Sequence, residues 1–480
     1  MRNDMDAKLK ISLTRLFSVW ADEQEERIEQ LPAHGSERQY YRIIGKSKKA
    51  IAAHNLDRAE NIAFLSFSKH FRGLNLPVPE IYGEDLQNNI YLEQDLGDTT
   101  LFSFLSEVRA EENFSQTIIN VYEQVIEILP YFQIVGGRDL DYSVCYPRYS
   151  FDLQSMMWDL NYFKYYFLKL AKISFDEQKL EDDFQKFVKF LLTAERDFFL
   201  YRDFQSRNVM LIEEHPYFID YQGGRKGALQ YDVASLLYDA KADIPQHVRV
   251  HLLHKYIEAA SRFISMDKKE FMEYYHGYVF IRIMQALGAY GFRGFYERKS
   301  HFLRSVPYAI QNLENLLQTT NLPIEIPELT SAWSRLVQST YLRQLADVDL
   351  RLRVRIQSFS YKRGIPWDDK GHGGGFVFDC RSLPNPGRYP EYAHMTGNDE
   401  QVTAFLDERS EVKEYLKNIF NIIDQVIVNY KSRNFTDLMV AFGCTGGQHR
   451  SVYCANMLRK YLLHLDNIDI EIRHRELEFL

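Results

Sequence analysis

The sequence predicts an α+β domain followed by a separate α/β domain, and three patterns in its 480 residues predict this division. Short strand-like runs fill the first hundred residues, helical periodicity dominates to about residue 320, and helices alternate with strands beyond residue 350. A stretch interrupted by prolines, 321–328, separates the last two patterns. We therefore expect one domain at 1–320, with lobes at about 1–98 and 99–320, then a linker and helix at 321–349, and a second domain at 350–480.

The first domain is expected to begin with helical spacing over residues 7–30, after which Ala33–Arg38 separates two short strand-like runs. The remaining elements of the first lobe are expected at Ala50–Ala53 (strand), Asn61–Phe71 (helix), Val78–Tyr82 (strand) and Asn89–Glu93 (strand). From Ser103 to Leu317 helices dominate, but two short apolar runs, Val209–Ile212 and Tyr217–Ile219, interrupt them. These runs flank a polar segment that carries the chemistry.

The second domain alternates helices and strands, and this alternation indicates a largely parallel sheet. Its helices are expected at Glu411–Asn429 and from about Arg450, with strands at Leu352–Phe359, Phe376–Cys380 and Asp437–Phe442, and the helix at Ser331–Leu345 is expected before it, next to the linker.

Composition excludes several classes of protein. The net charge of −8 argues against a strongly basic nucleic-acid binder, and the four cysteines form no CxxC pair that would indicate a structural zinc site or a disulfide framework. No stretch approaches the roughly 20 apolar residues of a membrane span, so no membrane partner is expected. The amino terminus lacks an apolar core with a cleavage site, and we therefore expect a cytoplasmic protein.

The polar segment Tyr201–Asn208 places a carboxylate five residues before a carboxamide, and Asp220 follows the next apolar runs. Phosphoryl transfer needs a base that receives the proton of the attacking hydroxyl, and oxygen ligands that hold magnesium against the phosphates. Asp203 suits the catalytic role, and Asn208 and Asp220 suit the metal-binding role. The alternative is a chance match, because aspartate in loops often makes local turns.

This segment resembles the catalytic core of the aminoglycoside phosphotransferase/choline kinase superfamily, a branch of the protein-kinase-like fold, and the resemblance covers roughly residues 1–320. Tyr201–Leu211, Ile219–Leu237, Gly35–Arg42 and Tyr91–Asp98 are similar to segments of bacterial anomeric kinases of N-acetylmuramate and N-acetylglucosamine. The resemblance implies a two-lobe fold that uses ATP and Mg2+ to phosphorylate a sugar during cell-wall recycling.

The same resemblance implies roles for further residues. Gly35, Ser36 and Arg38 would lie over the ATP phosphates, and the backbone from Gln94 to Leu96 would meet the adenine. Asp232 would be a structural brace for the active-site loop.

One departure concerns the strand Ala50–Asn55, which lacks the lysine that kinases present to the α- and β-phosphates. The absence indicates either a pseudokinase or a feature of this branch in which Arg38 supplies the cation. The acceptor also stays open, because an aminoglycoside, choline or another alcohol could replace the sugar. For the aromatic helix at 158–166, core packing is the favoured interpretation, and a sugar contact by Asp159 or Asn161 is the alternative.

In the second domain, Gly443–Ser451 joins an apolar strand to a helix. Glycines let backbone amides turn toward an anion, the helix offers its positive end, and His449 and Arg450 can complete the site. The spacing Cys444-x5-Arg450-Ser451 also has the form of a cysteine-dependent phosphatase loop, with Asp379 or Asp399 as general acid. We rank phosphate sensing above phosphatase activity, and a plain tight turn remains the third interpretation.

Residues 350–478 resemble the carboxy-terminal domain of the RNase adapter protein RapZ. The shared segments are Ser358–Pro366, Val377–Pro386, Met395–Gly397, Gly443–Ser451 and Arg473–Arg475. The resemblance implies binding of glucosamine-6-phosphate, together with contacts to RNA or protein. The ligand set that it implies is Asp379, Thr445, Gly446, His449 and Arg450, within a loop that also holds Cys444, Gly447 and Ser451.

Three departures from that family concern its RNA contacts. Gly387-Arg388 stands where a histidine is expected, Gln448 replaces a lysine, and the basic tail after Arg475 is missing. An RNA or protein partner is therefore left undecided. The two resemblances together predict an amino-sugar kinase with a sugar-phosphate sensor, and the alternative is a non-catalytic adapter.

Overall fold

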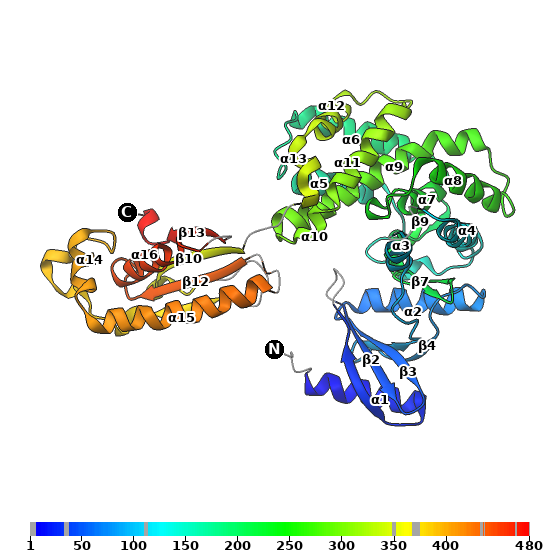
Figure 1. Ribbon diagram of the computed structural model, residues 1–480. Helices are drawn as coiled ribbons and strands as arrows, with labels where there is room; N and C mark the ends of the chain where they lie inside the picture. The colour runs from blue at the N-terminus through cyan, green and yellow to red at the C-terminus, as the bar shows by residue number, and fades with distance from the viewer. Residues whose placement is uncertain are drawn as a thin grey trace. The chain divides into compact units, whose positions relative to one another are not determined.

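A computed structural model describes residues 6–32, 38–109, 114–347, 352–366, 375–432, 435, 437–465 and 468–479 (Figure 1). The chain forms two compact units. The first unit comprises residues 1–292 and 305–346, and the second comprises residues 293–304 and 347–480. In the described part of the chain, no helix has both the length and the apolar character that a bilayer crossing requires.

The first lobe is a five-stranded antiparallel sheet between two helices (Figure 1). Leu13 and Phe17 of α1 are fully buried against one face of the sheet, and Phe64 of α2 stacks on Tyr91 at the other face, with 5.0 Å between the ring centroids. In spatial order, the strands are β1 (Glu25–Gln30), β2 (Gln39–Gly45), β3 (Lys49–His54), β5 (Ile90–Glu93) and β4 (Ile81–Asp85), and the helices are α1 (Ala7–Ala21) and α2 (Arg58–Gly73).

Two boundaries in this lobe differ from the predicted ones. The helix expected over 7–30 ends at Ala21, because Asp22 adopts a left-handed conformation with φ of 57° and closes the helix. The strand expected at Val78–Tyr82 begins at Ile81, after two prolines that cannot donate ladder hydrogen bonds.

The second lobe is mainly helical, and its short strands frame the predicted catalytic segment. Strand β6 (Phe198–Leu200) pairs with β9 (Arg225–Gly227), and β7 (Val209–Ile212) pairs with β8 (His215–Phe218). The helices are α3 (Leu101–Arg109), α4 (Gln116–Pro130), α5 (Leu153–Phe163), α6 (Glu177–Leu191), α7 (Leu229–Leu237), α8 (Gln246–Ala260), α9 (Lys268–Tyr290), α11 (Val306–Thr319), α12 (Pro327–Gln338) and α13 (Thr340–Arg343).

The segment expected to be a linker and helix packs into the first unit. Trp333 of α12 is almost fully buried and stacks on Phe280 with 4.2 Å between the ring centroids. The carboxylate of Asp183 accepts the backbone N–H groups of Glu328 and Leu329 at 2.7 and 3.1 Å, so it caps α12 from another helix. The expected single helix at 331–345 is divided at Ser339, which caps α13.

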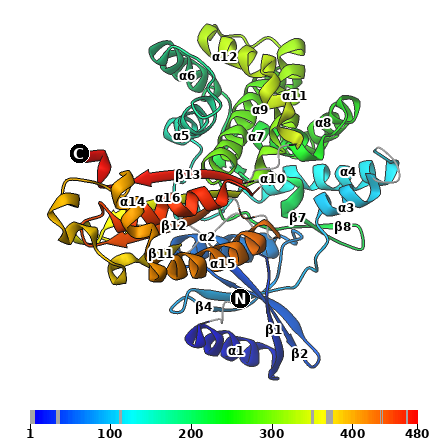
Figure 2. The same ribbon diagram turned by 60° about the vertical axis from the view of Figure 1, so that its left-hand side comes forward.

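The second unit contains a parallel sheet with strand order β11-β12-β10-β13, and helices lie against it (Figure 2). The strands are β10 (Leu352–Ser360), β11 (Phe376–Asp379), β12 (Asp437–Cys444) and β13 (Ile468–His474), and the longer helices are α14 (Glu400–Asp407), α15 (Ser410–Ser432) and α16 (Arg450–Leu462). All eight residues of β12 are buried, as expected of a central parallel strand. Sequence patterns had not indicated β13, whose burial alternates along an edge.

Candidate active site

Three predicted residues meet in the first unit at the ends of its short strands. Asn208 Nδ2 donates to the backbone oxygen of Asp203 at 2.9 Å and to Asp220 Oδ2 at 3.0 Å. Asp220 has φ of 69°, a left-handed conformation that is strained for a residue with a side chain. The backbone N–H of Ile219 bonds to the oxygen of Asn208 at 3.1 Å, which ties the two segments together. The loop of Asp203 and the carboxylate of Asp220 are thus joined through one carboxamide.

The electrostatics of this centre suit a cation. Burial raises the pKa of Asp220 to about 6, and the nearby charge of Asp203 adds to the rise, although the hydrogen bond from Gln222 opposes it. A buried carboxylate with a second carboxylate nearby forms a site where a divalent cation is stabilising. The donors are oxygen atoms of a carboxylate and a carboxamide, which magnesium prefers, so the residues present fit Mg2+.

Asp232 lies where the resemblance expects a structural brace, and it bonds to the backbone of the predicted catalytic loop. Its carboxylate is fully buried and accepts three hydrogen bonds, from Tyr201 N at 2.8 Å, Arg202 N at 3.0 Å and Gln133 Nε2 at 3.0 Å. Arg202 has φ of 84°, so the two bonds from Tyr201 and Arg202 hold a strained backbone beside Asp203. Asp239 makes a second brace, because it accepts both the backbone N–H and the hydroxyl of Ser206.

Asp159 is buried in an ion pair. It is 8% exposed and pairs with Arg202 Nη2 at 2.7 Å, so it positions the residue before Asp203. Asn161 lies two residues further along the same helix, α5. These placements favour the structural interpretation of this helix over a sugar contact by Asp159.

The predicted nucleotide-binding residues are only partly described. Gly35 and Ser36 lie outside the described residues. Gln94 and Leu96 follow β5, where the N–H of Gln94 is bound to the oxygen of Glu80 at 2.9 Å and Leu96 is buried. Arg38 precedes β2 and forms an ion pair with Glu60 of α2 at 3.1 Å. The sequence could not indicate this pair, because its members lie on separate elements.

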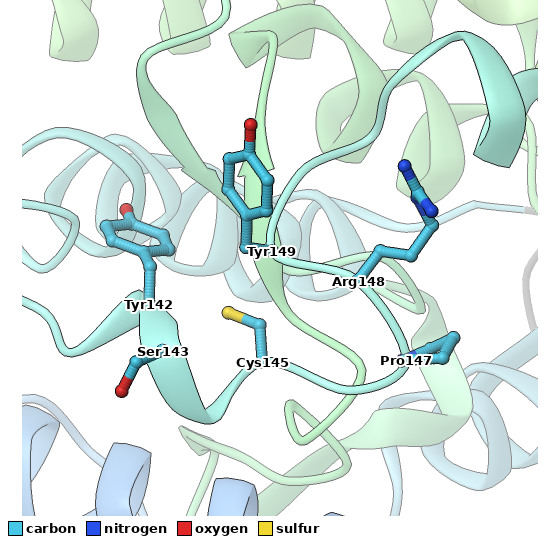
Figure 3. A pocket seen from close by; sticks show the side chains of 6 residues that line it. All are labelled: Tyr142, Ser143, Cys145, Pro147, Arg148 and Tyr149. Carbon is cyan, nitrogen blue, oxygen red and sulfur yellow. The ribbon is translucent and has the colours of Figure 1, made fainter.

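A pocket of about 560 Å³ lies beside β9, and sequence analysis missed it (Figure 3). Its segment is joined to β9 by the N–H of Lys226, which donates to Tyr149 O at 2.8 Å, and by Arg225 Nη2, which bonds to Tyr146 O at 3.4 Å. Burial lowers the pKa of Arg225 to about 10, and the charges of Asp159 and Asp203 oppose this. The residues that line the pocket are Tyr142, Ser143, Cys145, Pro147, Arg148 and Tyr149. The tyrosines repeated in this short segment were the available sequence signal.

In the second unit, the predicted loop follows β12 and surrounds a thiol. Cys444 Sγ accepts the N–H of Gly447 at 3.2 Å and lies 3.1 Å from Ser451 Oγ. Gly447 has φ of 71°, and a Cβ there would lie 2.9 Å from the backbone nitrogen of Ser360. The hydroxyl of Ser360 bonds to Thr445 O at 2.8 Å, whereas Gly446 has open space where its Cβ would be. The loop is therefore fixed by its own backbone and by β10.

The side chains around this loop are already engaged. Arg450 Nη1 donates to the backbone oxygens of Arg381 and Leu383 at 2.9 and 3.0 Å, and His449 Nε2 lies 2.9 Å from Tyr392 O. Asp379 pairs with Gly443 in the sheet register and forms an ion pair with Arg381 at 2.7 Å. Asp379 is therefore brought to the start of the loop, while His449 and Arg450 bind carbonyl groups. Asp399, the other proposed general acid, bonds to Thr396.

Comparison with protein families gives two matches. The model described as "Phosphotransferase enzyme family" matches residues 27–266, and the model described as "RapZ C-terminal domain" matches residues 352–478.

Curated relatives match about a third of the chain. A nucleotide-binding protein of Actinobacillus pleuropneumoniae serotype 5b (strain L20) is 36% identical over 166 residues, which cover 35% of this chain and 55% of the relative. A nucleotide-binding protein of Alteromonas mediterranea is 41% identical over 135 residues, which cover 28% of this chain and 46% of the relative. The chain spans about half the length of the curated relatives it matches.

Solved structures resemble the first unit. An ethanolamine kinase of Plasmodium vivax has a TM-score of 0.45 and 13% identity, with 65% of this chain and 89% of that chain covered. A choline kinase of Cryptosporidium parvum has a TM-score of 0.44 and 10% identity, with 68% of this chain and 99% of that chain covered. A spectinomycin phosphotransferase in complex with ADP and spectinomycin has a TM-score of 0.41 and 13% identity, covering 68% and 98%.

The predicted kinase-like two-lobe domain and the separate α/β domain are confirmed by these family matches and by the architecture described above. The phosphotransferase model spans half of the 480 residues. The chain therefore belongs to the phosphotransferase enzyme family and carries a RapZ C-terminal domain after its kinase-like unit.

Proposed function

We propose that the first unit transfers the γ-phosphoryl group of ATP to the anomeric hydroxyl of an amino sugar, N-acetylmuramic acid or N-acetylglucosamine, in cell-wall recycling. Membership of the phosphotransferase family supports the reaction type. The observation that carries the proposal is the junction of Asp203, Asn208 and Asp220 through the Asn208 carboxamide.

Each residue has one role in this reaction. Asp203 orients the acceptor hydroxyl and receives its proton, while the new P–O bond forms and the bond between the γ-phosphorus and the bridging oxygen breaks. Asn208 and Asp220 hold Mg2+, which neutralises charge on the phosphates when it is bound. Gly35 and Ser36 cover the phosphates, and the backbone from Gln94 to Leu96 meets the adenine. Asp232 keeps the loop of Asp203 in place through its bonds to Tyr201 and Arg202.

The pocket beside β9 supports a sugar acceptor. Tyr142 and Tyr149 present aromatic rings, which pack against the apolar faces of sugars, next to the hydroxyl of Ser143. Arg148 is the charged residue among the six described residues that line the pocket, and its guanidinium is paired with the carboxylate of Asp152. We therefore favour a sugar on the aromatic rings of this lining.

We further propose that the second unit binds a sugar phosphate at Gly443–Ser451 and adjusts kinase output or partner binding. The fixed, glycine-containing turn before α16 supports an anion site, and Asp379 at its start supports recognition of a sugar amine or hydroxyl. The contacts to Cys444 Sγ favour a second candidate, a cysteine-dependent phosphatase. Titration calorimetry with glucosamine-6-phosphate tests binding, and release of inorganic phosphate from that ligand would indicate the phosphatase instead.

Product analysis tests the function of the first unit. The full chain is incubated with ATP, Mg2+ and a panel of N-acetylmuramic acid, N-acetylglucosamine, choline and an aminoglycoside. We expect a 1-phosphate of one of the two amino sugars and ADP in equal amounts. Phosphorylation of choline or the aminoglycoside alone would reject the acceptor, and ATP left unchanged with all four would support a non-catalytic adapter.

A further inference from the structure

The middle of β3 carries no cationic side chain on the side that faces α2. Ala50 and Ala52 face the core around α1, so alternation along the strand turns Lys49, Ile51 and Ala53 toward the side of α2. Lys49, at the start of the strand, is 60% exposed and forms an ion pair with Asp95 at 3.3 Å. In the sheet register, Ala53 lies opposite Tyr40 on β2 and opposite Tyr91 on β5. A kinase-like site needs a cation near this position to bind the α- and β-phosphates. Ala53 stands there instead, buried between two tyrosines of the neighbouring strands.

Arg38 lies beside one of these tyrosines, Tyr40. It precedes Tyr40 by two residues, and its Nη1 donates to the hydroxyl of Tyr40 at 3.3 Å. Its guanidinium also lies over the ring of Phe64 on α2, 5.9 Å from the centroid. The arginine thus reaches from the start of β2 to the face of α2 that borders the sheet.

The guanidinium of Arg38 is buried but incompletely bonded. The residue is only 4% exposed, and among the described residues neither Nε nor Nη2 has a hydrogen-bond partner. Its charge is compensated by Glu60, whose Oε1 lies 3.1 Å from Nη2. Buried N–H groups without acceptors are destabilising, so this arrangement is suited to a ligand that brings acceptor oxygens.

A chain of polar contacts connects Arg38 with the proposed metal ligand. Glu60 Oε1 also faces Gln222 Nε2 at 3.4 Å, and the same Gln222 nitrogen donates to Asp220 Oδ1 at 2.6 Å. Glu60 is fixed from its other oxygen by Asn55 Nδ2 at 2.6 Å. Two side chains, those of Glu60 and Gln222, therefore connect Arg38 with Asp220.

We propose that Arg38, held by Glu60, binds the α- and β-phosphates of the nucleotide in place of a lysine on β3. The inference rests on the proposed kinase function. The planar guanidinium suits this role, because its parallel N–H groups can bind two phosphate oxygens at once. Arg38 is then a catalytic residue, and Glu60 is a positioning residue that acts through it.

The test compares adenosine with ADP. Binding of each is measured by titration calorimetry in the presence of Mg2+ for the parent, Arg38→Met, Glu60→Gln and the exposed control Arg27→Ala on β1. Arg38→Met is expected to bind adenosine like the parent and ADP about 10- to 100-fold more weakly, because charged hydrogen bonds to phosphate are lost. Glu60→Gln should show a smaller loss for ADP, and Arg27→Ala should show none.

A rescue variant separates a phosphate contact from a packing role. In Arg38→Ala/Ala53→Lys, a lysine on β3 occupies the space that Arg38 leaves, and ADP affinity and the KM for ATP should recover at least tenfold relative to Arg38→Ala. The inference would be overturned if Arg38→Met lost affinity for adenosine and ADP equally, or if its affinity for ADP were unchanged from the parent. Either result would leave the proposed kinase function intact. If the parent itself binds no nucleotide, the proposed function fails as well, and the inference fails with it.

Discussion

Replacing Asp159 by alanine tests how the protein holds Arg202, the residue that precedes the proposed catalytic base. Arg202 and Asp159 form an ion pair at 2.7 Å, and their side chains are only 14% and 11% exposed. Removing one partner of a buried pair costs about 3–5 kcal/mol, because the remaining charge stays buried without compensation. Here the rings of Phe151 and Tyr231 still face the guanidinium at 4.8 and 5.3 Å. Since such rings retain part of the compensation, we expect a loss of about 2–4 kcal/mol.

The assay is urea unfolding followed by tryptophan fluorescence. Trp20, Trp158 and Trp333 all lie in the first unit, so the signal reports mainly on the part of the chain that contains the pair. Arg202→Met and the double variant complete a double-mutant cycle. The double variant should lose at least about 1 kcal/mol less free energy of unfolding than the sum of the two single losses, because it leaves no unpaired charge.

An exposed ion pair provides the control. Lys69 and Glu84 lie 2.9 Å apart with side chains 60% and 42% exposed, so Glu84→Ala should change the free energy of unfolding by less than about 1 kcal/mol. If Asp159→Ala matched this small effect, or if the cycle proved additive, the buried pair would not be what holds Arg202.

Three further variants test other parts of the structure. Asn208→Ala should lower kcat about 100-fold and raise the Mg2+ concentration for half-maximal activity about 10- to 100-fold, and an unchanged Mg2+ dependence would contradict its role. Burial raises the pKa of Glu93 to about 8, although the charge of Arg38 opposes the rise. The stability that the neutral Glu93 contributes to the folded protein is therefore fully present below the unfolded pKa of 4.5 and is lost as the pH rises through 8. Between pH 6 and pH 9 the parent should lose on the order of 2 kcal/mol relative to Glu93→Gln in urea unfolding, and parallel curves would refute this. Gly447→Ala should destabilise the second unit by about 1–3 kcal/mol, seen as faster amide hydrogen exchange in α16, whereas Gly446→Ala, which has open space and no positive φ, should leave exchange unchanged.

Local patterns predicted many of the elements and brought the three candidate site residues together, but they missed β13 and several element ends. Asp203, Asn208 and Asp220 are close in sequence and flank a short hairpin, so their spacing alone brings them near each other. Strands such as β3 and β12 were found because runs of small or apolar residues mark burial on both sides. The kinase-like fold followed from the resemblance carried by that loop.

Long-range pairs could not be predicted in this way. The ion pair of Arg38 with Glu60 and the stacking of Trp333 on Phe280 depend on tertiary packing between separate elements. The packing of Trp333 also explains why a stretch rich in proline, which is typical of a linker, belongs instead to the first unit. Helix ends were uncertain for a simpler reason, since a single left-handed residue such as Asp22 decides where α1 stops.

Phosphorylation by an Asp203→Asn variant measures the central claim most directly. The variant keeps the size of the side chain but cannot accept the hydroxyl proton, so with ATP, Mg2+ and the preferred amino sugar we predict kcat at least about 100-fold below the parent. Its affinity for ADP should stay within about twofold of the parent, because the proposed nucleotide contacts are elsewhere. A folded variant that phosphorylated the sugar as fast as the parent would contradict the role of Asp203.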